Sequence, residues 1–107
     1  MNRKFMRILV FFDLPVVKKE DRKEYSIFRR FLINDGYSML QYSVYSRICN
    51  GSDGVEKHVI RLKANLPPKG SVRYLQLTEK QYSEMKFLVG SPKKQEKVIN
   101  SSQLNVF

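Results

Sequence analysis

The alternation of apolar and polar side chains predicts a strand followed by a helix in the first third of the chain. Residues 5–12 are rich in β-branched and aromatic side chains, and an Asp-Leu-Pro turn signal at residues 13–15 ends them. We therefore expect a buried central strand there. Apolar residues then recur at helical spacing over residues 20–35, which predicts a helix, and Gly36 supplies its left-handed C-terminal stop.

The middle of the chain carries a second set of elements. Residues 37–48 alternate with period two over a length that suits two strands, which we expect to be joined by a sharp bend near residues 41–42. A capping-box pattern at Asp53 predicts a second helix, whose apolar stripe continues to Leu66 before two prolines end it. Residues 71–77 alternate again and predict a further strand.

The last third of the chain adds only short elements. Thr78 and Gln81 form another capping-box pattern, which predicts a short turn of helix to residue 84, and residues 85–89 are expected to extend again. Residues 91–103 are polar and predict a loop or tail, while residues 104–107 could add one short edge strand.

The order of these elements predicts the fold. Strand, helix, strand, strand, helix, strand is the pattern of an α+β, ferredoxin-like βαββαβ fold, here with one or two extra short C-terminal strands. A chain of 107 residues has room for one core, so we expect a single domain over residues 1–90 and a polar C-terminal tail over residues 91–107. Because so small a domain buries a modest share of its surface, we also expect a homodimer.

The charge of the chain is strongly unbalanced. Twenty Lys and Arg face ten Asp and Glu, which gives a net charge of +10 and favours a nucleic-acid partner over a merely basic soluble protein. No apolar stretch reaches the length of a membrane span, so no membrane association is expected. Cys49 is the only cysteine, which excludes an internal disulfide and fits a reducing cytoplasm.

Two clusters of basic residues are candidates for phosphate contacts. Residues 57–78 contain five Lys and Arg, the last of them Arg73, and no acidic residue. The predicted first helix carries a second cluster, which neighbouring acidic residues partly offset. The candidate nucleic-acid-binding residues are Lys18, Lys19, Arg22, Arg29, Arg30, Lys57, Arg61, Lys63 and Lys69. The alternative for both clusters is an ordinary solvated helix face.

Asp13 ends the first predicted strand and is the candidate catalytic and metal-binding residue. A carboxylate on a rigid element can bind Mg²⁺, which often takes only one or two protein carboxylates and completes its shell with water. A dimer axis through this strand would bring two copies of Asp13 together. The alternative is an Asx-type turn before Leu14 and Pro15, which the residue chemistry alone favours.

Other residue types give weaker functional signals. His58 is the only histidine and lies beside the apolar stripe of the second helix, where a partly buried or surface imidazole is the ordinary interpretation and a catalytic role the less favoured one. Tyr42 and Tyr45 could stack on nucleobases, although packing in a core or interface is more common. The chain has no Walker A, GxGxxG, HExxH, CxxC or RRM pattern.

Five stretches of the sequence carry a family resemblance. They are M-R-I-L-V-F-F-D-L-P at residues 6–15, F-R-R-F-L at 28–32, G-Y-S-M-L-Q-Y-S-V-Y-S at 36–46, R-L-K-A-N-L-P-P-K-G at 61–70 and L-T-E-K-Q-Y at 77–82. Together they resemble the small CRISPR-associated adaptation protein family, the second of the two widely shared adaptation subunits, in the variant found in type II systems.

The resemblance implies a partner set and two functions. It implies a homodimeric scaffold that bridges dimers of the CRISPR integrase subunit and holds spacer duplex DNA. In this family the aspartate that ends the first strand, Asp13 here, is assigned to a metal, which implies a Mg²⁺-dependent endonuclease acting on RNA or duplex DNA as the alternative. We therefore expect Mg²⁺ at Asp13 of the dimer as the cofactor.

Overall fold

Four strands and three helices make up residues 5–92, the part of the chain that the computed structural model describes. They follow one another as β1 (Phe5–Asp13), α1 (Lys19–Asn34), β2 (Ser38–Gln41), β3 (Val44–Asn50), α2 (Gly51–Lys63), β4 (Ser71–Thr78) and α3 (Glu79–Ser83). The strands form one antiparallel sheet in the order β2-β3-β1-β4. The expected ferredoxin-like α+β fold is confirmed.

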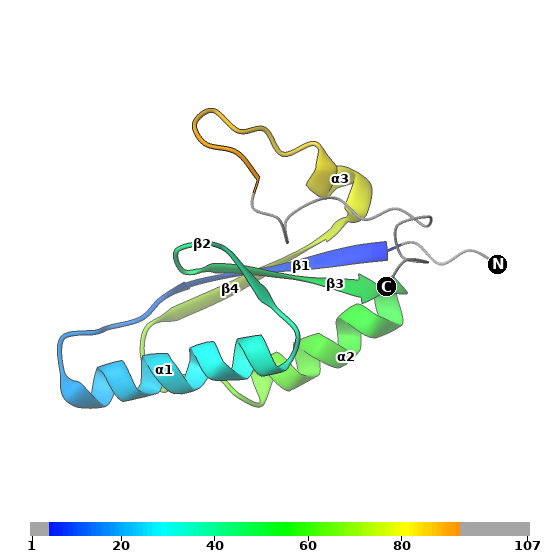
Figure 1. Ribbon diagram of the computed structural model, residues 1–107. Coiled ribbons are helices and arrows are strands. Elements are labelled where there is room, and N and C mark those ends of the chain that lie inside the picture. The colour runs from blue at the N-terminus through cyan, green and yellow to red at the C-terminus, as the bar shows by residue number, and fades with distance from the viewer. Residues whose placement is uncertain (1–4, 93–107) are drawn as a thin grey trace.

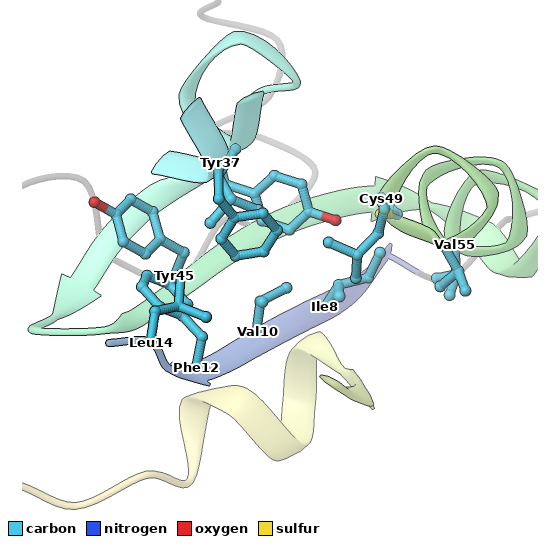
Figure 2. Close-up of a cluster of buried hydrophobic side chains, with 12 residues drawn as sticks. Ile8, Val10, Phe12, Leu14, Tyr37, Tyr45, Cys49 and Val55 are labelled. Atoms are coloured by element: carbon cyan, nitrogen blue, oxygen red, sulfur yellow. The ribbon is translucent and has the colours of Figure 1, made fainter. Parts of the chain in front are cut away.

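The sheet has two chemically different faces because side chains alternate along β1. Ile8 and Val10 are fully buried and Phe12 nearly so, on the face that α1 and α2 cover (Figure 1). Figure 2 shows these side chains rising from β1 into the same cluster as Tyr45 of β3. The opposite face, which we call the outer face, receives the intervening side chains of β1, namely Arg7, Leu9, Phe11 and Asp13.

Aromatic packing around Phe12 joins the sheet to α1. The ring of Phe12 lies 5.3 Å from that of Phe28, 5.6 Å from that of Tyr45 and 6.0 Å from that of Tyr25, measured between centroids. Each such pair stabilises by about 0.5–1.5 kcal/mol beyond the burial of its area. The strand and helix patterns predicted for the first third of the chain therefore meet in one core.

Both turns predicted between α1 and β3 are present. Gly36 has a φ of +95° and ends α1, and the guanidinium of Arg47 fills the space that a side chain at residue 36 would need. The bend between β2 and β3 comes at residues 42–43, where Ser43 has a φ of +63°. The amide of Phe12 donates a hydrogen bond to the carbonyl oxygen of Ser43 at 3.0 Å, which ties this bend to β1.

The second helix differs from its prediction at both ends. It begins at Gly51, whose φ of +79° turns the chain from β3 directly into the helix, so Asp53 lies in the first turn rather than at the N-cap. It ends at Lys63, and Leu66 beyond it is half exposed instead of continuing the apolar stripe.

The additional C-terminal strands are not formed within residues 5–92. Thr78 does cap α3 through the predicted capping box, with its hydroxyl accepting from the amide of Gln81 at 3.0 Å. Residues 85–89 follow as irregular chain because α3 turns the backbone away from β4 before a new strand could pair with it. The predicted edge strand at residues 104–107 lies outside the described residues.

A buried ion pair fastens α3 to the outer face. The guanidinium of Arg7 donates to both carboxylate oxygens of Glu79, at 2.7 and 3.1 Å, and lies 4.3 Å from the ring centroid of Tyr82. Arg7 is 4% exposed and Glu79 9% exposed, so the pair is almost fully removed from water. α3 therefore covers the Arg7 end of the outer face and leaves its Asp13 end open.

Candidate metal site and nucleic-acid interface

Asp13 is exposed at the last position of β1, on the outer face. Its register partner on β4 is Ser71, and Phe11, two residues earlier, pairs with Arg73. Directly paired residues project to the same side of a sheet, so all four side chains belong to the outer face. They line one shallow hollow, whose full lining is Phe11, Phe12, Asp13, Ser71, Arg73, Tyr74 and Leu75.

The carboxylate of Asp13 stands apart from other metal-ligating side chains. Among residues 5–92, no group of three or more His, Cys, Asp or Glu is placed to hold an ion. An exposed carboxylate on a regular strand is nevertheless a hard oxygen donor of the kind that suits Mg²⁺, which needs few protein ligands. The site fits a magnesium ion that takes its other ligands from water, phosphate or a second chain.

Four of the nine predicted nucleic-acid-binding residues contact other groups within the chain. Arg22 donates to the carbonyl oxygen of Val17 at 2.6 Å, and Arg29 donates to the hydroxyl of Tyr45 at 2.9 Å. Arg61 donates to a carboxylate oxygen of Asp35 at 2.8 Å, and the ammonium of Lys69 lies 3.8 Å from a carboxylate oxygen of Asp21. These four basic side chains therefore already have partners within the fold.

The other five candidates are exposed and have no side-chain partner within residues 5–92. They are Lys18, Lys19 and Arg30 of the α1 region and Lys57 and Lys63 of α2. Because α1 and α2 lie on the same side of the sheet, their exposed cations belong to one helical layer (Figure 1). We call these five residues the free helical cations.

His58 serves the fold rather than an open site. It is 5% exposed, and its Nδ1 lies 2.9 Å from a carboxylate oxygen of Asp35. Burial raises the pKa of Asp35, but the hydrogen bonds from His58 and Arg61 outweigh it and hold that pKa below its usual value. The network joins the end of α1 to α2 on the face opposite Asp13. The sequence offers little indication of this network, because Asp35 and His58 lie 23 residues apart.

Of the two tyrosines considered for base stacking, Tyr45 is in the core and Tyr42 is on the surface. Tyr45 is 1% exposed and packs against Phe12, as the ordinary interpretation predicted. Tyr42 is 83% exposed at the bend between β2 and β3. Cys49 is buried, and burial raises the pKa of its thiol.

Apolar side chains gather at the outer face beyond α3. A hollow there is lined by residues of β2, by Tyr82 and by residues 85–89, and the side chains of Leu88 and Val89 are 96% and 91% exposed. Among the strands of residues 5–92, β4 lies at an edge of the sheet, and its Leu75 is 53% exposed. None of the helices within residues 5–92 combines the length and apolar character needed to cross a bilayer.

Comparison with known proteins identifies the family of the chain. The family model described as CRISPR associated protein Cas2 matches residues 6–85. A protein of Acidovorax ebreus named CRISPR-associated endoribonuclease Cas2 is 62% identical over 102 residues, which cover 95% of this chain and all of that protein. One of the same name from Ligilactobacillus salivarius is 48% identical and is matched over 94% of this chain and 98% of its own.

A solved structure is similar in fold. A chain described as the crystal structure of cas2 superposes with a TM-score of 0.57 at 19% identity, covering 84% of this chain and 92% of that one. At that identity the match supports the ferredoxin-like fold alone.

Proposed function

The chain belongs to the CRISPR-associated protein Cas2 family, and from this premise we propose that it is a DNA-binding homodimeric scaffold of the CRISPR spacer-acquisition complex. The observation that carries the proposal is the set of free helical cations, which belong to one helical layer and have no side-chain partner within residues 5–92. Duplex DNA presents closely spaced phosphates that such side chains can contact without reading sequence.

The homodimer is supported by the surfaces that one copy leaves uncovered. The β4 edge and the apolar side chains of residues 85–89 would be costly to leave in water, and a second copy would cover them. Two copies would carry a net charge of +20, twice the +10 of one chain. A two-fold scaffold of this kind would offer two equivalent surfaces to the CRISPR integrase subunit.

DNA binding is tested by removing the free helical cations. We expect Lys57→Gln and Lys63→Gln each to weaken binding of a short duplex and to lower its logarithmic salt slope by up to about 0.9, the value for one lost phosphate contact. Lys80→Gln removes the same charge from α3, on the other side of the sheet, and is the matched control. Equal slopes for Lys57→Gln, Lys63→Gln and the parent would contradict the proposal.

Arg61→Gln separates the two roles of basic residues on α2. Because Arg61 is bound to Asp35, its substitution should lower stability and change the salt slope less than Lys57→Gln does. Fluorescence anisotropy and urea unfolding measured on the same samples distinguish these effects.

A Mg²⁺-dependent endonuclease acting on RNA or duplex DNA through Asp13 is the second candidate function. The hollow around Asp13 favours it, since it places an exposed carboxylate and an arginine on the same face of adjacent strands. The similar proteins of Acidovorax ebreus and Ligilactobacillus salivarius are named endoribonucleases, which agrees with this chemistry.

In this second function the chain would supply the position of the carboxylate. Asp13 would hold the ion, and the pairing of Asp13 with Ser71 of β4 would keep its side chain on the outer face. A bound Mg²⁺ would polarise a phosphoryl oxygen and offset the charge that develops on the phosphate. The homodimer would contribute a second Asp13.

One comparison separates the two functions. Parent and Asp13→Ala are assayed side by side for spacer integration with the cognate integrase and for Mg²⁺-dependent cleavage of RNA and duplex DNA. Full integration by the variant assigns the scaffold role, and cleavage at the parental rate by the variant contradicts the endonuclease. Failure of integration by Asp13→Ala with intact duplex binding would contradict a purely passive scaffold.

A further inference from the structure

The hollow around Asp13 holds a second charged side chain, Arg73, which the family resemblance does not include. Asp13 pairs with Ser71 and Arg73 lies two residues further along β4, so Asp13 and Arg73 are diagonal neighbours on the outer face. Diagonal residues of adjacent strands lie about 7–8 Å apart, and their Cβ atoms are somewhat closer. The two side chains can therefore approach the same small ligand from opposite sides.

Arg73 is available to such a ligand. It is exposed, and within residues 5–92 its guanidinium makes no ion pair, although Asp13 is close by. The unpaired arrangement leaves space between carboxylate and guanidinium. A phosphate group bound there would accept hydrogen bonds of about 2.8 Å from the guanidinium, while its metal-bound oxygen would lie about 2.1 Å from an ion held by the carboxylate.

The surroundings favour an anion at Arg73. Of the seven residues that line the hollow, Arg73 is the only cation and Asp13 the only anion. Phe11, the register partner of Arg73, and Leu75, two residues further along β4, are the apolar neighbours of Arg73 in this lining. Both strands are continuously paired here, which holds the position of the arginine.

We propose that Arg73 binds the non-bridging oxygens of the phosphodiester whose phosphate is presented to Asp13. This inference rests on the endonuclease proposed above and adds the residue that would orient its substrate. The planar guanidinium can donate two parallel hydrogen bonds to one phosphate, which a lysine cannot do. The substrate class is a nucleic-acid backbone, and the contact is independent of base identity.

The test measures binding separately from cleavage. Affinity for a short single-stranded RNA is measured by fluorescence anisotropy in EDTA, and kcat and KM are measured in Mg²⁺, for the parent, Arg73→Gln, Arg73→Lys and Arg73→Ala. We expect Arg73→Gln to bind about tenfold more weakly or worse, the loss expected for a charge-assisted bidentate contact. The affinity of Arg73→Lys should lie between that of the parent and that of Arg73→Gln. Added guanidinium should restore cleavage by Arg73→Ala.

Controls distinguish a phosphate contact from loss of one charge or of structure. Lys80→Gln removes one exposed positive charge from α3 and should bind like the parent. Thermal unfolding should give the parental stability for Arg73→Gln, because the side chain is exposed, and light scattering measures whether the variant keeps the parental oligomeric state. Parental affinity of Arg73→Gln, or a loss that occurs only together with a change in oligomeric state, would overturn the inference.

The inference and the endonuclease can fail separately. If the parent cleaves no RNA or DNA in Mg²⁺, the endonuclease is refuted and the anisotropy titration still decides whether Arg73 contacts phosphate. If the parent cleaves and Asp13→Asn does not, but Arg73→Gln retains the parental affinity, KM and kcat, the endonuclease stands and the role of Arg73 is refuted.

Discussion

Replacing either partner of the Arg7–Glu79 pair should destabilise the protein strongly, and replacing both should restore most of the loss. In Glu79→Met the guanidinium of Arg7 loses both carboxylate oxygens, at 2.7 and 3.1 Å, while it stays 4% exposed. Breaking a buried pair in this way costs about 3–5 kcal/mol. In Arg7→Met a buried carboxylate remains and the contact with Tyr82 is lost as well, which adds about 1–2 kcal/mol.

The double variant removes both charges and leaves two apolar side chains of similar length. Well-packed apolar replacements of a buried ion pair are often neutral or stabilising, so Arg7→Met/Glu79→Met should exceed either single variant in stability by about 2 kcal/mol or more. The difference between the double variant and the sum of the singles is the interaction free energy of the pair.

Urea unfolding followed by far-ultraviolet circular dichroism measures all four proteins. The protein concentration is held constant, because a homodimer makes apparent stability depend on concentration. Lys80→Met, on the exposed side of the same helix, controls for a methionine in α3. Single variants within about 1 kcal/mol of the parent, or additive effects of the two substitutions, would refute the reasoning.

Three further predictions concern the core and the turns. The pKa of Asp35 is lowered in the folded state, so its contribution to stability is present above the unfolded carboxyl pKa of about 3.9 and is lost as pH falls through the lower folded pKa. Urea unfolding at a series of pH values should therefore show that the free energy of unfolding falls less steeply with acid for Asp35→Asn than for the parent. Cys49, 4% exposed and with its pKa raised by burial, should react with Ellman's reagent far more slowly in the folded protein than in urea, and equal rates would contradict its burial. Gly70→Ala should destabilise by about 1–3 kcal/mol because φ is +91° and the new Cβ would lie 2.6 Å from the carbonyl oxygen of Asp13. Gly54→Ala within α2, where the nearest atom is 3.4 Å away, should not destabilise and serves as its control in thermal unfolding.

The parts of the fold that depend on neighbouring residues could be predicted from the sequence. The apolar run of β1, the spacing along α1, the stop at Gly36 and the capping box at Thr78 are local signals, and each is present in the structure. The strand over residues 85–89 did not form, because α3 turns the backbone away from the edge of β4, and local alternation does not report where the chain runs relative to a partner edge.

The partners of charged residues could not be predicted, because they lie far apart in the sequence. Arg7 meets Glu79 across 72 positions and Arg61 meets Asp35 across 26. The sequence therefore grouped Lys57 with Arg61 as equivalent cations, whereas only the first is free. Asp13 is a candidate from its place at the end of a predicted strand, whereas its position relative to Arg73 depends on the register of β1 against β4, which the sequence does not give.

The one-residue alternation of β1 has an evolutionary consequence. Ile8, Val10 and Phe12 hold the core, and the residues between them belong to the outer face, so a change at Asp13 alters the open surface with little effect on packing. The free helical cations are separated from that surface by the whole thickness of the sheet. Substitutions on one face of this fold can therefore accumulate with little effect on the residues of the other face.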